Sequence, residues 1–351
     1  SYFVFALIGI FFSRPFFASQ TEIAQVQEYG VEYLTVCCTA SIGIFVQITF
    51  ERLLQSTGKT IYTMITQGTG AIINLILDPI MIFGYFGIPE MGVAGAAAAT
   101  VIGQIVAAML AVYFNHRFNH DINVSFRRFR PDIRLILQIY KVGAPSIVVQ
   151  AIGSVMTYGM NLILAAFGAA QTVFGVYFKL QSFFFMPVFG LNNGMVPIIA
   201  YNFGAGHRDR VVQTVKSSIK FGVGIMIAGL LIMELLPGPL LRMFNATEEI
   251  LEIGIPALRT ICLSFAFAGF CIVAGSAFQA LGNGIYSMIV SIARQLCVLL
   301  PVAKLLSLSG NVHFIWWAFP IAETVSMVLS ILFLIRIYRK VISHIGEEMS
   351  A

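Results

Sequence analysis

Long apolar runs separated by short polar connectors make up almost the whole chain. Ten runs are long enough to cross about 30 Å of hydrocarbon as a helix. They are continuous rather than alternating, which favours helices over a barrel. The predicted spans are residues 1–18, 31–54, 60–85, 92–115, 137–167, 170–202, 213–237, 250–281, 284–308 and 314–338. The pattern therefore predicts an all-α polytopic membrane protein.

The composition agrees with this assignment, because 58% of the residues are hydrophobic and only 11% are charged. Soluble domains carry roughly 25% charged residues, so this chain has too few to cover a water-exposed surface. The formal net charge of +5 does not point to nucleic acid, since most basic residues lie between the apolar runs. We expect the lipid bilayer as a partner and no nucleic acid.

Basic residues gather in alternate connectors, and this orients the chain. Connectors rich in Lys and Arg face the cytoplasm, whereas the other connectors of this chain carry mainly Glu. The basic connectors and the tail contain Arg52, Lys59, Arg117, Arg127, Arg128, Arg130, Arg134, Arg208, Arg210, Arg336 and Arg339. We predict a multi-pass protein of the cell (inner or plasma) membrane with a cytoplasmic carboxyl terminus. Glu51, beside Arg52 near a span end, is grouped with these connector charges.

The sequence repeats itself at a fixed distance. Residues 55–65 (QSTGKTIYTMI) match residues 279–289 (QALGNGIYSMI), 224 positions later. The same offset pairs spans two to four with spans eight to ten in the same membrane orientation, which indicates two structural lobes related by an axis along the membrane normal.

The repeat also predicts the domain organisation. We expect an amino-terminal lobe at 1–115, a basic cytoplasmic linker at 116–136, a carboxyl-terminal lobe at 137–338 and a cytoplasmic tail at 339–351. Symmetry requires six spans in each lobe, yet four precede the linker, and the chain opens abruptly inside an apolar run without Met. Our interpretation is that ten of twelve spans are present and that two more precede residue 1 in a longer protein.

One carboxylate interrupts the apolar run 71–84 (AIINLILDPIMIFG). Asp78 lies near its middle, Asn74 precedes it by one helical turn on the same face, and Pro79 follows it. A charge at mid-membrane costs at least ~2.5–3.5 kcal/mol, so such a side chain normally faces protein or a wet cavity. A carboxyl group in that setting can exchange a proton, and an amide can hydrogen-bond it in either protonation state. Asp78 and Asn74 are our candidate cation-coupling pair; the alternative is a structural Asp bonded to a neighbouring helix.

Other intramembrane polar and soft side chains suggest a cavity in the second lobe. Lys179 and Gln181 lie inside the sixth span, where Lys179 either lines a cavity or snorkels to the interface. Met156 offers an adaptable contact for flat apolar cations, although plain packing is the common role of Met. Glu323 is interpreted as the structural partner of a nearby base.

Enzyme and metal motifs are lacking in the sequence. It contains no HExxH and no GxSxG. The five Cys residues lie inside apolar runs without metal-ligand spacing, so neither a disulfide framework nor a zinc site is expected. We predict a protein that is not an enzyme and that has no metal site.

Four motifs, in order, resemble those of the multidrug and toxic compound extrusion (MATE) family. They are residues 143–146 (GAPS), 190–197 (GLNNGMVP), 201–207 (YNFGAGH) and 279–282 (QALG). The resemblance covers the whole chain from the family's third helix onward. It implies two lobes that form a V around a central cavity, a fold in which this chain holds ten of twelve helices.

The resemblance also assigns site residues. Asn74 and Asp78 look like the fifth-helix pair of the DinF-like prokaryotic branch, in which the Asp is implicated in proton coupling. Tyr33 and Thr100 look like further members of the same amino-terminal-lobe cavity. Sodium-coupled relatives place acids on the seventh and tenth helices, but residues 137–166 and 255–280 contain no Asp or Glu. This difference favours H⁺ over Na⁺.

These observations predict a secondary active multidrug efflux transporter that exports organic, mainly cationic, compounds by antiport with H⁺. The expected partners are small-molecule drugs or toxic metabolites, the expected state is a monomer, and no cofactor is expected beyond the coupling ion. The alternatives are a lipid-linked oligosaccharide flippase of the same superfamily, a Na⁺-coupled exporter and, outside transporters, a membrane scaffold or enzyme.

Overall fold

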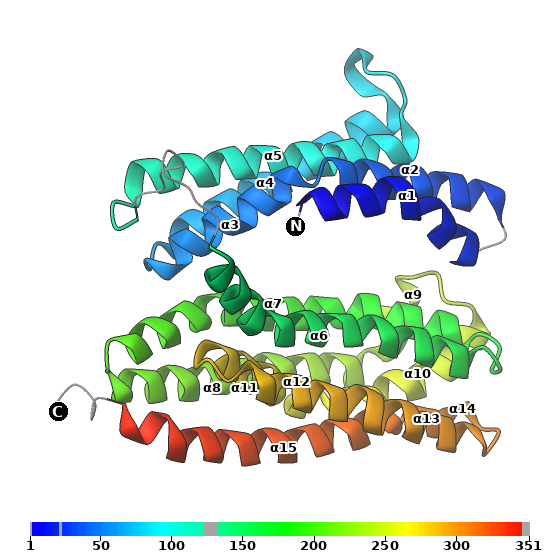
Figure 1. Ribbon diagram of the computed structural model, residues 1–351. Coiled ribbons are helices and arrows are strands. Elements are labelled where there is room, and N and C mark those ends of the chain that lie inside the picture. Colours follow the sequence, from blue (N-terminus) through cyan, green and yellow to red (C-terminus); the bar gives the residue numbers. More distant parts are fainter. Residues whose placement is uncertain (1, 21–22, 123–131, 346–351) are drawn as a thin grey trace. The chain divides into compact units, whose positions relative to one another are not determined.

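The computed structural model describes residues 2–20, 23–122 and 132–345. The chain divides into two compact units, Ser1–Phe129 and Arg130–Ala351. Figure 1 colours the amino-terminal unit from blue to teal and the carboxyl-terminal unit from green to red. Each unit is built from helices that pack against others of the same unit.

The amino-terminal unit has five α-helices among its described residues. They are α1 (Tyr2–Gln20), α2 (Ala24–Thr39), α3 (Ile42–Ser56), α4 (Thr60–Phe83) and α5 (Gly92–Phe118). The axes of α2 and α3 differ in direction by 48°, so the two helices form a bent pair, which is long and apolar enough for a membrane span only when both are taken together. A short 3₁₀ turn, Tyr85–Gly87, joins α4 to α5, and these two helices lie side by side along most of their length (Figure 1).

Glycines set the limits of α4. Gly58, in the left-handed region at φ 77°, ends the turn that precedes the helix. Gly84 closes the helix at φ 74° and donates its backbone N–H to the carbonyl of Ile80. Only a residue without Cβ adopts such a φ at low cost. The helix therefore begins and ends at fixed positions, with Asn74 and Asp78 in its second half.

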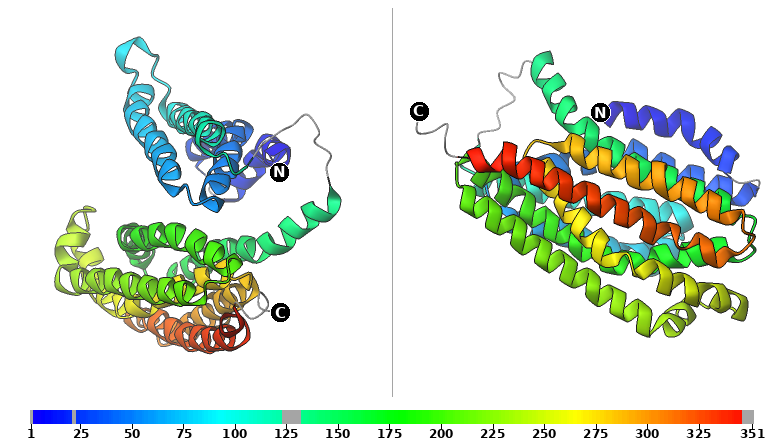
Figure 2. Two further views of the ribbon diagram at one scale, coloured as in Figure 1. Left: turned by 90° about the vertical axis from the view of Figure 1, so that its left-hand side faces the viewer. Right: turned by 90° about the horizontal axis from the view of Figure 1, so that it is seen from below.

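The carboxyl-terminal unit is the larger. Its helices are α6 (Ile133–Leu164), α7 (Ala170–Gly204), α8 (Arg208–Leu235), α9 (Pro237–Arg242), α10 (Glu248–Cys262), α11 (Phe265–Ala280), α12 (Gly284–Ile292), the π-helix η3 (Ala293–Leu299), α13 (Leu300–Ser307), α14 (Val312–Ile315), α15 (Ala318–Lys340) and the 3₁₀ turn η4 (Ile342–His344). α11 packs against both α8 and α15 (Figure 2). The core includes the fully buried side chains of Trp316, Phe174, Phe265 and Phe278.

The repeat predicted from the sequence is confirmed. α10 and α11 begin 224 and 223 positions after α2 and α3, and they form a bent pair of 50° against 48° in the first unit. α4 begins at Thr60 and ends at Phe83, while the segment formed by α12, η3 and α13 begins at Gly284 and ends at Ser307. The two units thus repeat one helical pattern along the chain.

The repeat is broken at one place. α4 is a continuous α-helix, but its counterpart contains seven residues of π-helix at Ala293–Leu299. π-Helical turns are rare and are often found at functional sites. Arg294 and Gln295 lie in this segment.

The described residues hold seven helices long and apolar enough to cross a membrane, and nine such spans when the two bent pairs are included. The sequence predicted ten. The remaining predicted run, residues 1–18, corresponds to α1, whose apolar part, Tyr2–Ala18, is shorter than the other spans.

The boundary between the two units lies between Phe129 and Arg130. This is inside the predicted linker 116–136, but the helices extend into that linker from both ends, to Phe118 and from Ile133. Residues 123–131, which include several of its basic residues, lie outside the described residues.

Candidate functional site

Asp78 and Asn74 meet on α4 as the sequence spacing predicts. The Nδ2 of Asn74 donates to the Oδ1 of Asp78 at 3.1 Å. Both side chains are partly buried. Residues four apart lie on one face of a helix, so this contact follows from local geometry alone.

A third polar group comes from α5. The Nδ2 of Asn74 lies 3.3 Å from the Oγ1 of Thr100, whose hydroxyl donates to the carbonyl of Ala96 at 3.0 Å. Asn74 therefore bridges Asp78 and Thr100. We call these three residues the Asp78 cluster.

Small residues allow α5 to approach α4 this closely. A Cβ added at Gly103 would lie 2.7 Å from the carbonyl oxygen of Gly70, and 3.4 Å from the Cβ of Asn74. The first distance is shorter than real Cβ contacts allow, so the two backbones touch at this glycine pair. Such close helix approach through small residues is typical of membrane helices, and here it brings Thr100 within reach of Asn74.

The Asp78 cluster has no cation in it. Ion pairs within 4 Å join Lys59 to Asp121, Arg259 to Glu234, and Arg294 to Glu323, and among the residues that the structure describes Asp78 has no such partner. A partly buried carboxylate held only by a neutral amide is poorly compensated. Asp78 is therefore retained as a candidate for binding a proton or a small cation.

Tyr33 does not join the cluster. It lies on α2 with 38% of its surface exposed, and its hydroxyl lies beside the thiol of Cys37 one turn further on. Within the described residues it forms no hydrogen bond with Asp78, Asn74 or Thr100. α2 packs against α5, the helix that carries Thr100.

The three candidates in the carboxyl-terminal unit do not form a cluster either. The Nζ of Lys179 on α7 lies 5.8 Å from the ring centre of Phe244, a cation–π geometry. Gln181 is partly buried two residues further along α7. Met156 on α6 packs against the hydrophobic core of the unit. Lys179 is thus held by an aromatic ring, a partner that the sequence analysis did not identify.

Glu323 has the role expected from the sequence. Its Oε1 accepts from the Nη1 of Arg294 at 2.8 Å, which makes it the partner of a nearby base. The Oε2 of Glu323 is buried, as are the hydroxyls of Ser326 and Ser330, which follow on α15. Within the part of the chain that the structure describes, these three groups have no hydrogen bond of ordinary distance and angle. The thiol of Cys271 lies beside both hydroxyls.

One functional candidate was missed. Glu51 was grouped with connector charges, but it is only 4% exposed. Its carboxylate accepts hydrogen bonds from Gln47 on its own helix α3 and from Thr66 and Gln67 on α4. The available signal was the group of polar residues at positions 63, 66 and 67, in the first half of the span that also carries Asn74 and Asp78.

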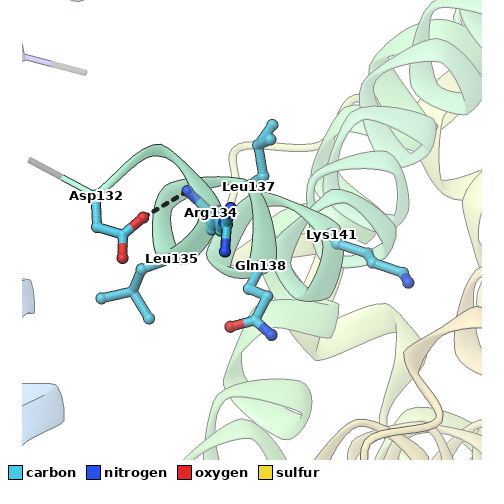
Figure 3. A pocket seen from close by; sticks show the side chains of 6 residues that line it. All are labelled: Asp132, Arg134, Leu135, Leu137, Gln138 and Lys141. Atoms are coloured by element: carbon cyan, nitrogen blue, oxygen red, sulfur yellow. Dashed lines mark hydrogen bonds between the residues drawn. The ribbon is translucent and has the colours of Figure 1, made fainter.

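Two surface pockets lie elsewhere on the described residues. One, of about 410 Å³, lies along the start of α6 and is lined by Asp132, Arg134, Leu135, Leu137, Gln138 and Lys141 (Figure 3). The side chain of Asp132 caps that helix by accepting from the N–H of Arg134 at 2.8 Å. Since a single helical segment and its cap supply the lining, this pocket is a surface groove.

The second pocket, of about 550 Å³, lies between α3 and α5 and is lined mainly by apolar side chains, among them Ile42, Val46, Ile105 and Met109. Neither pocket includes Asp78 or Glu51. Among the described residues no group of three or more His, Cys, Asp or Glu side chains is arranged to hold a metal ion.

Comparison with known proteins places this helical pattern in a family. The family model described as MatE matches residues 1–80 and 145–304. The chain is 26% identical over 329 residues to the multidrug export protein MepA of Staphylococcus haemolyticus, a match that covers 93% of this chain and 71% of that protein. It is 28% identical over 290 residues to the probable multidrug resistance protein NorM of Thermotoga maritima, covering 80% of this chain and 60% of that protein.

Solved structures agree with the sequence matches. The structure of the MATE multidrug transporter DinF-BH has a TM-score of 0.85 and 29% sequence identity, and the match covers 96% of this chain and 75% of that one. The chain thus spans 60% to 71% of the length of the two curated relatives.

Proposed function

The chain belongs to the MatE family, and on that premise we propose that it is a secondary active transporter that exports organic, mainly cationic, compounds in exchange for H⁺. The names of MepA and NorM as multidrug export and resistance proteins support the substrate class. The proposal includes a place in the cell membrane as a monomer with a cytoplasmic carboxyl terminus and no enzymatic activity.

One observation supports the coupling ion above all. Asp78 lies inside an apolar helix, and its carboxylate accepts a hydrogen bond from the neutral amide of Asn74 at 3.1 Å. An ionised carboxylate in such a setting is stabilised by hydrogen bonds alone. Protonation is the simplest way to remove the free-energy cost of keeping this charge out of water. Among the described residues no guanidinium or ammonium group lies within 4 Å of the Asp78 carboxylate, and in this proposal the carboxyl group is therefore free to change its protonation state.

The cluster explains how protonation acts on its surroundings. While Asp78 is ionised, the Nδ2 of Asn74 donates to it and also faces Thr100. Once Asp78 carries a proton, its O–H donates, and the carbonyl oxygen of the Asn74 amide is the matching acceptor. That change turns the amide and breaks its contact with Thr100, which alters the link between α4 and α5.

Exchange follows from this two-state element. In the outward-facing form H⁺ binds Asp78, which weakens the binding of a cationic substrate and releases it outside; the proton then leaves on the cytoplasmic side. A bound proton and a bound cationic substrate oppose each other through charge, which is the differential interaction that coupling requires.

The test is Asp78→Asn, assayed for efflux of a fluorescent organic cation from proteoliposomes under an imposed pH gradient. We expect loss of pH-driven efflux with normal insertion, because Asn keeps the size but cannot exchange a proton. Glu90→Gln, which removes an exposed acid just after α4, is the matched control and should transport normally.

A Na⁺ gradient imposed at constant pH is the second arm of the assay. If a Na⁺ gradient alone drives efflux, the coupling ion at this carboxylate is Na⁺ and not H⁺. Full pH-driven efflux by Asp78→Asn would overturn the proposed mechanism.

A further inference from the structure

Glu51 is a second acid that lies among neutral groups. It is 4% exposed, and its Oε1 accepts from the Nε2 of Gln47 at 2.9 Å and from the hydroxyl of Thr66 at 2.7 Å. Its Oε2 accepts from the Nε2 of Gln67 at 2.8 Å. Three neutral donors therefore surround the carboxylate, and the Thr66 hydroxyl, which has a single proton, also lies 2.9 Å from the carbonyl oxygen of Thr63 as an alternative acceptor.

The charged groups on the neighbouring elements are engaged elsewhere. Arg52, the next residue on α3, donates to the Oε1 of Gln55 at 2.6 Å, and Lys59 pairs with Asp121 at 3.0 Å. On α5 the guanidinium of Arg117 lies 5.9 Å from the ring centre of Phe118. The remaining titratable groups are Tyr62 and Asp78 on α4 and Tyr113 and His116 on α5. Among the described residues no cation lies within 4 Å of Glu51.

The donor set favours a proton over a metal ion. Two amide N–H groups and one hydroxyl are directed at the carboxylate oxygens. A metal ion would have to displace these donors, since it needs several lone pairs directed at itself. A proton needs one lone pair, and the Oε2, which accepts a single hydrogen bond, has one to offer.

The position of Glu51 relates it to the Asp78 cluster along α4. Gln67 precedes Asp78 by eleven residues on that helix, which corresponds to about 16 Å at 1.5 Å per residue. Thr63, Gln67, Gly70, Asn74 and Asp78 follow one another at intervals of three or four residues, so they share one face of α4. The Glu51 end of this face is the one next to Lys59, whose connector is assigned to the cytoplasm by its basic charge.

We propose that Glu51 is a second proton-binding group of the amino-terminal unit, which takes up and gives back one proton at a carboxylate oxygen during the transport cycle. An O–H bond forms on the carboxylate when the proton arrives and breaks when it leaves to water on the cytoplasmic side. The proposal rests on the proton-coupled export proposed above, and it adds a site nearer the cytoplasm to the one at Asp78.

The sharpest test changes a donor rather than the acid. Thr66→Val keeps the shape of the side chain but removes the hydroxyl 2.7 Å from the Oε1. Loss of one hydrogen bond to the ionised form should move the pH at which efflux is half-maximal upward by about one unit. Thr63→Val is the matched control, because that hydroxyl lies 3.4 Å from the backbone carbonyl of Glu51 and not at its carboxylate; it should leave the pH profile in place.

A direct readout follows the acids themselves. Infrared difference spectra recorded across a pH titration report the C=O stretch of protonated carboxyl groups. We expect Glu51→Gln to remove one titrating band that Asp78→Asn leaves in place. An unchanged titration in Glu51→Gln, or a pH profile of Thr66→Val equal to that of Thr63→Val, would overturn the assignment.

The two proposals fail in different ways. If Asp78→Asn abolishes efflux while Thr66→Val has no effect on the pH profile, the proposed transport mechanism is supported and the proposed proton site at Glu51 is rejected. If Asp78→Asn keeps full pH-driven efflux, the mechanism falls, and the infrared titration of Glu51→Gln still decides whether Glu51 exchanges a proton.

Discussion

The two units use the same helical pattern but treat buried charge in opposite ways. In the amino-terminal unit, Asp78 and Glu51 are held by neutral amides and hydroxyls. In the carboxyl-terminal unit, the largely buried Glu323 lies 2.8 Å from the guanidinium of Arg294. An acid without a cation can change its protonation state at modest cost, whereas an acid locked to a guanidinium keeps its charge.

Equivalent positions of the repeat show how the difference arises. Gly70, which lets α5 touch α4, corresponds to Arg294 at the offset of 224 residues, and Glu51 corresponds to Gly275. At the first pair of positions the amino-terminal unit has a close helix contact, and the carboxyl-terminal unit has an arginine paired with an acid. At the second pair the amino-terminal unit has an acid, and the carboxyl-terminal unit has a glycine without a side chain. In the proposals made above, the amino-terminal unit exchanges protons, whereas the carboxyl-terminal unit keeps a fixed internal charge.

The largest expected effect breaks the fixed pair. In Arg294→Met, Glu323 loses the guanidinium at 2.8 Å and remains a buried acid with 14% of its side chain exposed. Breaking a buried pair in this way typically costs about 3–5 kcal/mol of stability. Reversible unfolding in detergent, compared with Asp78→Asn, measures the difference; Asp78→Asn, which removes a poorly compensated acid, should unfold no earlier than the unaltered protein.

The double variant Arg294→Met with Glu323→Leu is the control for that prediction. It removes both charges and should recover most of the lost stability, since apolar replacements of a buried pair are often neutral. A single Arg294→Met variant as stable as the unaltered protein would mean that the pair carries little weight, and the contrast between the units would disappear.

A smaller effect is expected from substitution of Asn74, which donates a hydrogen bond to Asp78, the acid proposed to exchange a proton. Asn74→Leu removes the amide that donates to Asp78 at 3.1 Å. Hydrogen bonds to charged groups contribute about 1.5–3 kcal/mol, so the ionised form should become about 10- to 100-fold less favourable. The pH at which efflux is half-maximal should rise by about one to two units, while stability changes little. A profile that does not move would show that Asn74 does not hold the ionised carboxylate.

Thr100→Val tests the outer member of the same cluster. The contact between Asn74 and Thr100, at 3.3 Å, joins two neutral groups. Such a bond contributes about 0.5–1.5 kcal/mol, so we expect a change of roughly two- to tenfold in efflux rate and a shift of the pH profile smaller than that of Asn74→Leu. If Thr100→Val shifts the profile more than Asn74→Leu does, the order of contacts inferred for the cluster is wrong.

The sequence predicted those features that depend on local spacing. The helical repeat at 224 residues and the contact of Asn74 with Asp78 follow from intervals that can be counted along the chain. Glu51 could not be placed in this way, because its burial depends on Thr66 and Gln67, which reach it from a different helix. Its neighbour Arg52 made it resemble a connector charge.

Long-range partners were the other features that spacing did not predict. Lys179 lies over the ring of Phe244, 65 residues away along the chain. The bends between α2 and α3 and between α10 and α11 also have no proline at the break, so the apolar pattern runs through them unchanged. The composition of these segments therefore predicts a span but not the change in helix-axis direction within it.

The smallest effect is expected at the exposed pair of the carboxyl-terminal unit. Arg259 and Glu234 lie 3.8 Å apart with 53% and 42% of their side chains exposed, so water screens their charges. Surface pairs contribute about 0–1 kcal/mol, and Arg259→Gln should lower the unfolding temperature only slightly compared with Arg294→Met. Equal losses in the two variants would show that burial does not set the strength of the arginine pairs, and the distinction drawn between fixed and exchangeable charge would then need another cause.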